Sequence, residues 1–250
     1  MYSVRKMINT LNESSLHRAL KTIYSLDNNS KTEEQVSQWI CDIVQNENVI
    51  IEIQTANVSS LKNKIKCLLE MGKTVKIVHP VVISKTIKTS DIYGTIISTR
   101  KSPKKESIYS IFRQLTGITE FLLHENFILE IPQISIIEHR LKTSQAQQSK
   151  NKKRRFLKDW QKTDKELKEI FTISTFSKKE DYLNLLPQYK EQNKELCNNF
   201  TAKQTASLLK QKINAAAATN THCMLWVLKK AGMIQETLKI KNEKHYKISE

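Results

Sequence analysis

Hydrophobic positions follow a helical spacing in two segments near the start of this 250-residue chain. Apolar side chains recur three or four residues apart over residues 11–26 and again over 58–71, and both patterns predict amphipathic helices. The second helix is expected to end before Gly72, because glycine is common just past a helix C-terminus. The polar segment 27–34 after the first helix predicts a loop.

Short apolar runs rich in β-branched residues predict strands around the second helix. Residues 36–44 and 49–55 are expected to form a hairpin joined by the turn Asn46-Glu47-Asn48. Further strands are expected at 74–79, 81–88 and 93–99. The resulting order, α-β-β-α-β-β-β, predicts an α/β fold in which helices flank a mixed sheet.

The second half of the chain predicts a change of organisation. Short helices at 108–116 and 119–124 precede a strand at 127–131. Residues 143–153 are polar and without periodicity, which is typical of a linker, and helical spacing resumes at 154–170. The expected divisions are a first domain over 1–142, a basic linker with connecting helices over 143–198, and a C-terminal domain over 199–250.

The last fifty residues predict the order helix, helix, hairpin. Thr201 and Gln204 form a capping box at the start of the first helix, which runs to about Lys212. The second helix is expected over 215–231 and ends before Gly232. The arms of the hairpin are expected at 233–236 and 244–248. This order resembles the winged helix domain, in which the second helix enters the major groove of DNA.

Charge adds a partner to this picture. The chain has 41 Lys and Arg against 25 Asp and Glu, a net charge of +16, with most of the excess in residues 150–250. An excess of this size indicates a polyanion, most often nucleic acid, although a compositional bias toward Lys, Asn and Ile is the alternative. The four cysteines form no C-x-x-C pair, and neither a membrane span nor a secretory signal is visible. We therefore expect a cytoplasmic protein without a membrane partner.

Two acidic residues on the predicted hairpin carry the candidate chemistry. With a three-residue turn, Asp42 lies opposite Glu52, and opposed Cβ atoms are about 4.5–5.5 Å apart. The two charges repel, and a divalent cation would resolve the conflict because Mg²⁺ prefers carboxylate oxygens. Two solvated carboxylates at a sheet edge are the alternative interpretation.

Asp42, nine intervening residues and then Glu52-Ile53-Gln54 in an apolar strand resemble the PD-(D/E)XK nuclease superfamily. The resemblance covers roughly residues 11–99, including the α-β-β-α-β order of that superfamily's core. It implies that Mg²⁺ or Mn²⁺ is held by Asp42, Glu52 and the carbonyl of Ile53. It also implies hydrolysis of a phosphodiester bond with help from the cation.

One departure from the family pattern matters for catalysis. Gln54 stands where the family's lysine usually stands, and Lys64 on the next helix could reach the site in its place and stabilise developing charge. Glu13 takes the place of an acidic residue that precedes the motif in many members, where it would hold a water molecule. Its alternative role is that of an acid favoured by the helix dipole. His17 and Lys21 follow Glu13 on the same side of the first helix.

Basic clusters and the C-terminal module predict contacts with the phosphate backbone. One cluster is a loop after a predicted strand, and the other lies where the linker meets the next helix; their expected contacts are Arg100, Lys101, Lys104, Lys105, Lys153, Arg154 and Arg155. In the winged helix, the contacts expected from the second helix and wing are Thr219, Asn220, His222, Lys229, Lys239, Lys241 and Lys244. Leu225 and Leu228 are expected to pack inward, and Trp226 to fill the core or an interface.

These observations favour a metal-dependent DNA endonuclease that acts in restriction, defence or repair. The alternative, which Gln54 favours, is a catalytically inactive protein with a nuclease fold that has a DNA-binding or regulatory role. An RNA-directed nuclease also stays open, because net charge does not separate DNA from RNA. Many nucleases of this class act as homodimers, but no dimer face can be identified from the sequence.

Overall fold

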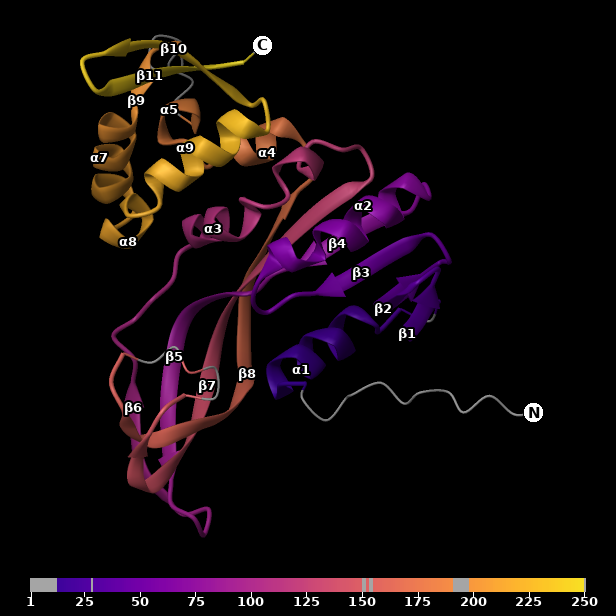
Figure 1. Ribbon diagram of the computed structural model, residues 1–250, viewed down its shortest axis with the longest axis vertical. Helices are drawn as coiled ribbons and strands as arrows, with labels where there is room; N and C mark the ends of the chain where they lie inside the picture. Colours follow the sequence, from indigo (N-terminus) through magenta and orange to yellow (C-terminus); the bar gives the residue numbers. More distant parts are fainter. Residues whose placement is uncertain (1–12, 28, 150–151, 153–154, 191–197, 250) are drawn as a thin grey trace.

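The computed structural model describes residues 13–27, 29–149, 152, 155–190 and 198–249 (Figure 1). The helices longer than two turns are α1 (Ser15–Tyr24), α2 (Lys62–Glu70), α7 (Ala202–Lys212) and α9 (Thr221–Lys230). The short helices are α3 (Phe112–Leu115), α4 (Lys179–Leu183), α5 (Pro187–Lys190) and α8 (Ala215–Ala218), with 3-10 turns at Val58–Leu61, Ile108–Ile111 and Thr119–Phe121.

Most strands belong to one mixed sheet of eight, and three belong to a small C-terminal sheet. The strands of the large sheet are β1 (Ser30–Val36), β2 (Trp39–Gln45), β3 (Val49–Ile53), β4 (Thr74–Val78), β5 (Val81–Ser90), β6 (Ile96–Lys101), β7 (Phe127–Gln147) and β8 (Lys158–Phe176). The strands of the small sheet are β9 (Phe200–Thr201), β10 (Ile234–Ile240) and β11 (Glu243–Ile248).

The large sheet has the order β1-β2-β3-β4-β7-β5-β6, and β8 pairs with β7. β1, β2 and β3 are antiparallel, whereas β4 runs parallel to β3 after the crossover through α2. Leu16 and Leu20 of α1 pack on one face of the sheet, and Ile65 and Leu68 of α2 belong to the core on the other face. The predicted α/β class, a mixed sheet flanked by helices, is confirmed.

Two predicted segments were wrong. The loop expected at 27–34 contains strand β1, whose side chains are almost all exposed, so it shows no apolar alternation. The helix expected at 154–170 is instead strand β8, which pairs with β7 along most of its length. Leu167 and Ile170 are three residues apart but pair with Ile136 and Ile134, because bulges in β8 shift the alternation of its side chains. The apolar residues of β8 therefore have a helix-like spacing in the sequence because bulges interrupt the alternation of the strand.

The predicted boundaries in the second half also need correction. The strand expected at 127–131 extends to Gln147, so the boundary expected after residue 142 falls inside β7. The helix expected over 215–231 is divided into α8 and α9, with a turn at Thr219 and Asn220. The hairpin expected near the C-terminus is present as β10 and β11. No helix among the described residues is long and apolar enough to cross a membrane.

β5, β6 and the distal halves of β7 and β8 form an arm that projects from the main body (Figure 1). Glu138 is 2% exposed in this arm. Its carboxylate accepts bonds from the Arg140 guanidinium at 2.5 and 2.8 Å, from Lys85 Nζ at 3.2 Å and from Lys162 Nζ at 3.1 Å. Burial alone would raise the pKa of Glu138, but Arg140, Lys162 and Lys85 outweigh it and lower that pKa to about 2.

Glu138→Gln is expected to destabilise the protein at pH 7 but not near pH 2. Because the pKa of Glu138 falls on folding, its stabilisation is present above the ordinary value of 4.5 and is lost as the pH drops toward 2. The difference between the two pKa values corresponds to roughly 3 kcal/mol of unfolding free energy. Urea unfolding of both proteins from pH 7 to pH 2 measures this. A constant gap across that range would contradict it, and Glu34→Gln, an exposed carboxylate on β1, is the control.

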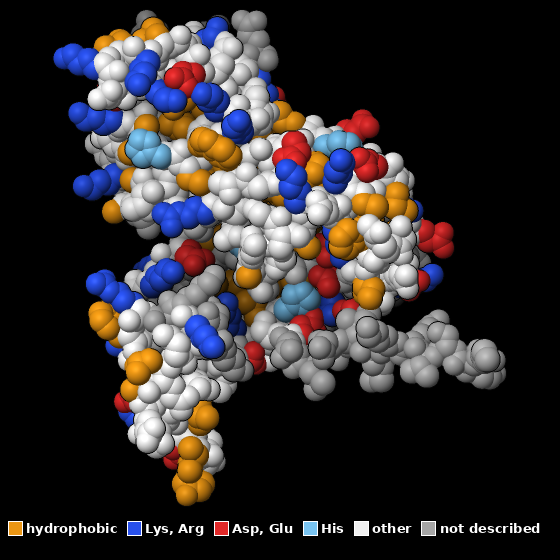
Figure 2. Space-filling model, in the orientation of Figure 1, with side chains coloured by type: hydrophobic (Ala, Val, Ile, Leu, Met, Phe, Trp, Pro, Cys, Tyr) orange, Lys and Arg blue, Asp and Glu red, His pale blue; other side chains and the backbone are white. Residues whose placement is uncertain are grey.

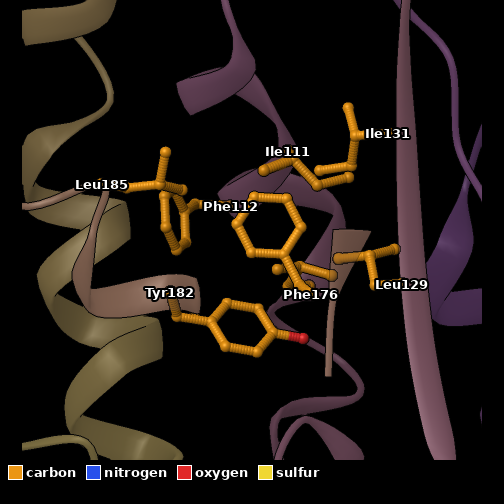
Figure 3. Close-up of a pocket in the computed structure, with 8 residues that line it drawn as sticks. Ile111, Phe112, Leu129, Ile131, Phe176, Tyr182 and Leu185 are labelled. Carbon is orange, nitrogen blue, oxygen red and sulfur yellow. The ribbon is translucent and has the colours of Figure 1, made fainter. Parts of the chain in front are cut away.

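The C-terminal module packs against the large sheet through a continuous apolar core. α9 lies against α3, and Met224, Val227 and Leu228 share one buried cluster with Phe112 and Leu115. Figure 3 shows the neighbouring seam, where the rings of Phe112, Phe176 and Tyr182 meet; the Phe176 and Tyr182 ring centroids are 5.1 Å apart. The gap between these side chains has no space for a water molecule. It is therefore a close-packed apolar contact and not a ligand site.

Candidate functional site

The candidate site lies where strand β3 ends beside the middle of β2, between α1 and α2. The ladder pairs Ile43 with Ile51 and Val44 with Ile50, and the same register places Asp42 opposite Glu52. At this point side-chain bonds replace the regular ladder. The Asp42 N–H donates to Glu52 Oε1 at 3.2 Å, and the Ile53 N–H donates to Asp42 Oδ2 at 2.8 Å. The two carboxylates are therefore tied to each other's strands.

Glu52 faces helix α2. It is 5% exposed, and its Oε1 lies 2.5 Å from the ammonium of Lys64, which also donates to the Ile40 carbonyl at 2.5 Å. Burial raises the pKa of Glu52 to about 7; Lys64 opposes this rise, and the charge of Asp42 adds to it. The structure thus brings Lys64 to the predicted acid from a neighbouring helix.

Asp42 leans toward helix α1. Its Oδ2 is 3.5 Å from His17 Nε2, and its Oδ1 accepts no hydrogen bond from a described residue. Burial would raise the pKa of Asp42, but the contact with His17, the Ile53 N–H and the charges of His17 and Lys64 lower it overall. Asp42 is therefore an ionised carboxylate with one oxygen available to a ligand.

Helix α1 extends this network of alternating charges. The Glu13 carboxylate contacts His17 Nδ1 and lies 2.8 Å from Lys21 Nζ, which in turn lies 2.5 Å from Glu33 on β1. Burial would lower the pKa of His17, but Asp42 and Glu13 outweigh it and raise that pKa. The structure therefore places Glu13, His17 and Asp42 in one contiguous row.

Gln54 is the last residue of the predicted motif, and both its side chain and its backbone carbonyl form hydrogen bonds. Gln54 Nε2 donates to Ser60 Oγ at 3.4 Å, on the side of the sheet that carries α2. The carbonyl of Gln54 accepts from His79 Nδ1 at 2.6 Å, and His79 is buried directly behind the strand end. Burial lowers the pKa of His79. His79 therefore fixes the backbone that carries Glu52 and Gln54.

The oxygen atoms of this site are of the kind that a hard cation prefers as ligands. Asp42, Glu52 and the Ile53 carbonyl supply oxygen ligands, which Mg²⁺ and Mn²⁺ prefer. Within the described ranges, no group of three or more His, Cys, Asp or Glu side chains is arranged to hold a metal ion. A cation here would therefore rest on two carboxylates and a carbonyl, and Lys64 would have to share Glu52 with it.

The predicted basic cluster near residue 100 lies on the arm. Arg100 and Lys101 are exposed in β6, an edge strand and not the loop that was expected, and Lys104 and Lys105 are exposed just after it. In the second cluster Arg155 is exposed, with its guanidinium 5.2 Å from the centre of the Phe156 ring. Lys153 and Arg154 lie outside the described residues.

The predicted contacts in the C-terminal module differ in their exposure. Thr219, His222, Lys239 and Lys241 are exposed, whereas Asn220 is 7% exposed, so its prediction as a surface contact was wrong. Asn220 is buried because it stands at the junction of α8 and α9, where the chain turns into the core. Lys229 and Lys244 both form ion pairs with Glu236, at 2.5 and 3.2 Å. Leu225 and Leu228 are buried as expected, but Trp226 is 46% exposed.

Sequence reasoning missed three residues that support the site. Glu33 lies on β1, which was expected to be a loop, and Asp164 lies on β8, which was expected to be a helix. Asp164 accepts bonds from the N–H and hydroxyl of Ser15 across 149 positions of sequence. Only His79 had a local signal, since it ends a predicted strand directly before Pro80.

Comparison with known proteins places the chain in a family. A family model described as "Domain of unknown function (DUF8091)" matches residues 14–177. The chain belongs to this family. The DUF8091 match begins at the N-cap of α1 and ends just after β8, so it includes the arm and the candidate site apart from Glu13, and it leaves out the C-terminal module.

One curated relative is described as an uncharacterized protein of Treponema pallidum (strain Nichols). It is 36% identical over 124 residues, which are 50% of this chain and 49% of that protein. The chain therefore spans about half the length of the relative that it matches. No solved structure matches the chain.

Proposed function

We propose that this DUF8091 protein is a metal-dependent DNA endonuclease that hydrolyses phosphodiester bonds and acts in restriction, defence or repair in the cytoplasm. The observation that carries the proposal is the meeting of Asp42, Glu52 and Lys64 at one strand end, with Lys64 Nζ 2.5 Å from Glu52 Oε1. Two carboxylates and an ammonium are the groups that phosphodiester hydrolysis requires for a cation and for developing negative charge.

The arrangement of elements supports a core like that of PD-(D/E)XK nucleases. α1 precedes the antiparallel strands β1, β2 and β3, and α2 then crosses to β4, parallel to β3. In the C-terminal module, β9 precedes α7, α8 and α9, and the hairpin β10–β11 pairs back to β9. This order supports a winged helix, whose exposed Lys239 and Lys241 would approach a DNA backbone.

The residues of the site divide the chemistry between them. Asp42, Glu52 and the Ile53 carbonyl would hold the cation, which when bound supplies a lowered pKa for water and charge for the scissile phosphate. Lys64 donates to the oxygen that gains negative charge, because its ammonium lies beside Glu52 on the same face. Gln54 can orient water through its amide, and Glu13 holds His17 against Asp42.

A second candidate function has its own supporting observation. In the described site each carboxylate is already matched by a cationic partner: Glu52 by Lys64, Asp42 by His17, and Glu13 by Lys21. A site in which each carboxylate charge is already neutralised suits a catalytically inactive nuclease-fold protein that binds DNA. Gln54 in place of the family's lysine supports the same alternative.

Cleavage of supercoiled plasmid and short duplexes separates the two functions. The wild-type protein is expected to nick DNA in Mg²⁺ or Mn²⁺ and to lose this activity in EDTA. Glu52→Ala is expected to lose the activity in all conditions, because it removes a cation ligand. The matched control is Glu34→Ala, an exposed carboxylate on β1 that lies outside the site.

Each result has a defined meaning. Metal-dependent nicking that Glu52→Ala loses and Glu34→Ala keeps would establish the endonuclease. DNA binding without nicking in either metal would overturn it and favour the inactive DNA-binding protein. Cleavage of RNA duplexes in preference to DNA would overturn the assignment of DNA as substrate.

A further inference from the structure

The face of the large sheet that α1 covers continues onto the arm, beyond the end of the helix. Ile134 and Ile136 of β7 pack with Leu16 and Leu20 of α1. Because alternate residues of a strand share a face, Glu138 and Arg140 continue this face past the helix. Lys85 from β5 and Lys162 from β8 reach Glu138 there. Three strands therefore bring cations to one surface.

This surface holds more positive charge than the fold neutralises. Glu138 is the carboxylate that Lys85, Arg140 and Lys162 contact, and Lys165 stands opposite it in the register of β7 and β8. The backbone of Lys165 pairs with that of Glu138, and the charges of Glu138 and Glu106 act on its ammonium. Burial lowers the pKa of the Lys165 ammonium, and the charges of Lys162 and Lys85 lower it further. The charges of Glu138 and Glu106 raise this pKa but do not outweigh the other effects. Such an excess of cations on a folded surface suits an anionic ligand.

The cationic surface adjoins the candidate site. The Ser15 N–H donates to Asp164 Oδ1 at 3.0 Å, and its hydroxyl contacts the same carboxylate. Asp164 immediately precedes Lys165, and Ser15 lies two residues before His17 of the site. Figure 1 shows the first turn of α1 beside β8. A chain that lies along the arm therefore approaches the start of α1, where His17 contacts Asp42.

Arg140 is held in a geometry suited to phosphate. Its guanidinium lies 3.5 Å from the centre of the Trp160 ring while its nitrogens bond Glu138, so the side chain is ordered before a ligand arrives. Figure 2 shows Lys and Arg side chains on the arm and on the C-terminal module. A duplex carries phosphates at regular intervals and can contact several such cations at once.

We propose that Lys85, Arg140, Lys162 and Lys165, here called the arm clamp, bind the phosphodiester backbone of duplex DNA and lead it toward Asp42 at the edge of the candidate site. The proposal rests on the proposed function only in its second part, the delivery of DNA to the carboxylates. Backbone binding by the arm clamp stands on the charges and contacts of the arm itself.

Fluorescence anisotropy with a labelled DNA duplex in EDTA tests the clamp without cleavage. The double variant Lys162→Met/Lys165→Met of the full chain is expected to bind at least about tenfold more weakly at low salt. Its plot of log affinity against log salt is expected to be shallower by about 2, because each lost phosphate contact removes about 0.9 from the slope. The control is Lys66→Met, an exposed lysine of α2 on the opposite face.

Thermal unfolding guards against a loss of fold. Lys165→Met alone is expected to melt at or above the wild-type temperature, because burial and the charges of Lys162 and Lys85 disfavour the ammonium that it removes. Weaker DNA binding by a variant at least as stable as wild type therefore cannot come from unfolding.

The outcomes separate the clamp from the nuclease. A double variant that binds with the same affinity and salt slope as Lys66→Met would overturn the clamp, even if the wild type cleaves DNA. Loss of binding by the double variant supports the clamp, even if the wild type never cleaves. Wild-type binding to duplex RNA but not to duplex DNA would overturn the choice of ligand.

Discussion

Replacing Lys64 by Met is expected to lower the rate of Mg²⁺-dependent DNA cleavage by about a hundredfold to a thousandfold. Lys64 is the ammonium beside the carboxylate pair, and loss of one preorganised donor to a developing negative charge has a cost of this size. Lys62→Met is the matched control, because Lys62 lies on the same helix but is exposed and pairs with Glu120 at 2.6 Å. Single-turnover cleavage of a short duplex measures the rates.

A lysine at position 54 is expected to restore part of this loss. Gln54 shares the strand face of Glu52, since the two residues are two positions apart, and its amide already points toward the side that carries α2. The variant Lys64→Met/Gln54→Lys should therefore cleave faster than Lys64→Met. Recovery of cleavage separates a catalytic role of the ammonium from its role as the buried partner of Glu52.

Two results would contradict this role of Lys64. Cleavage by Lys64→Met at the wild-type rate would remove Lys64 from the chemistry. If Lys64→Met melts well below wild type, the conservative Lys64→Arg keeps the charge beside Glu52. If Lys64→Arg then loses as much activity as Lys64→Met, and Gln54→Lys restores none of it, this result would also contradict a catalytic role of Lys64.

The core of the site could be predicted because short-range geometry determines it. A hairpin turn of known length sets the register of two strands, so the placement of Asp42 opposite Glu52 follows from counting residues. Helical periodicity likewise places Lys64 among the inward positions of α2, beside Ile65 and Leu68. Neither pattern could show that the Asp42 carboxyl leans to α1 while that of Glu52 leans to α2, because packing of the two helices decides this.

The arm could not be predicted for a different reason. β8 has bulges that move its apolar residues out of strict alternation, and its distal half carries many exposed charges that suit either a strand or a helix. β1 is exposed on both faces and lacks any apolar period. The contacts of Glu138 with Lys85 and of Asp164 with Ser15 join distant segments, so no short window of sequence contains both partners.

The C-terminal module and the large sheet are expected to unfold in one transition, although the sequence divides them. Met224 of α9 is fully buried in the cluster that contains Phe112 and Leu115, so removing its side chain leaves a cavity common to both parts. Met224→Ala is expected to lower the unfolding free energy by about 2–5 kcal/mol. The melting temperature of the whole chain should fall by roughly 2–4 °C for each kcal/mol.

Differential scanning calorimetry measures this, with Trp226→Ala as the control on the same helix. Trp226 is 46% exposed, so its removal leaves little cavity and should move the transition far less. Two separate transitions, of which only one responds to Met224→Ala, would contradict a common core. A single transition also means that deletion of residues 199–250 exposes the core of the large sheet, so the proposed DNA binding by the β10–β11 hairpin is better tested with Lys239→Glu and Lys241→Glu in the full chain. Because the common core holds α9 against α3, the β10–β11 hairpin and the arm keep a fixed arrangement in the folded chain.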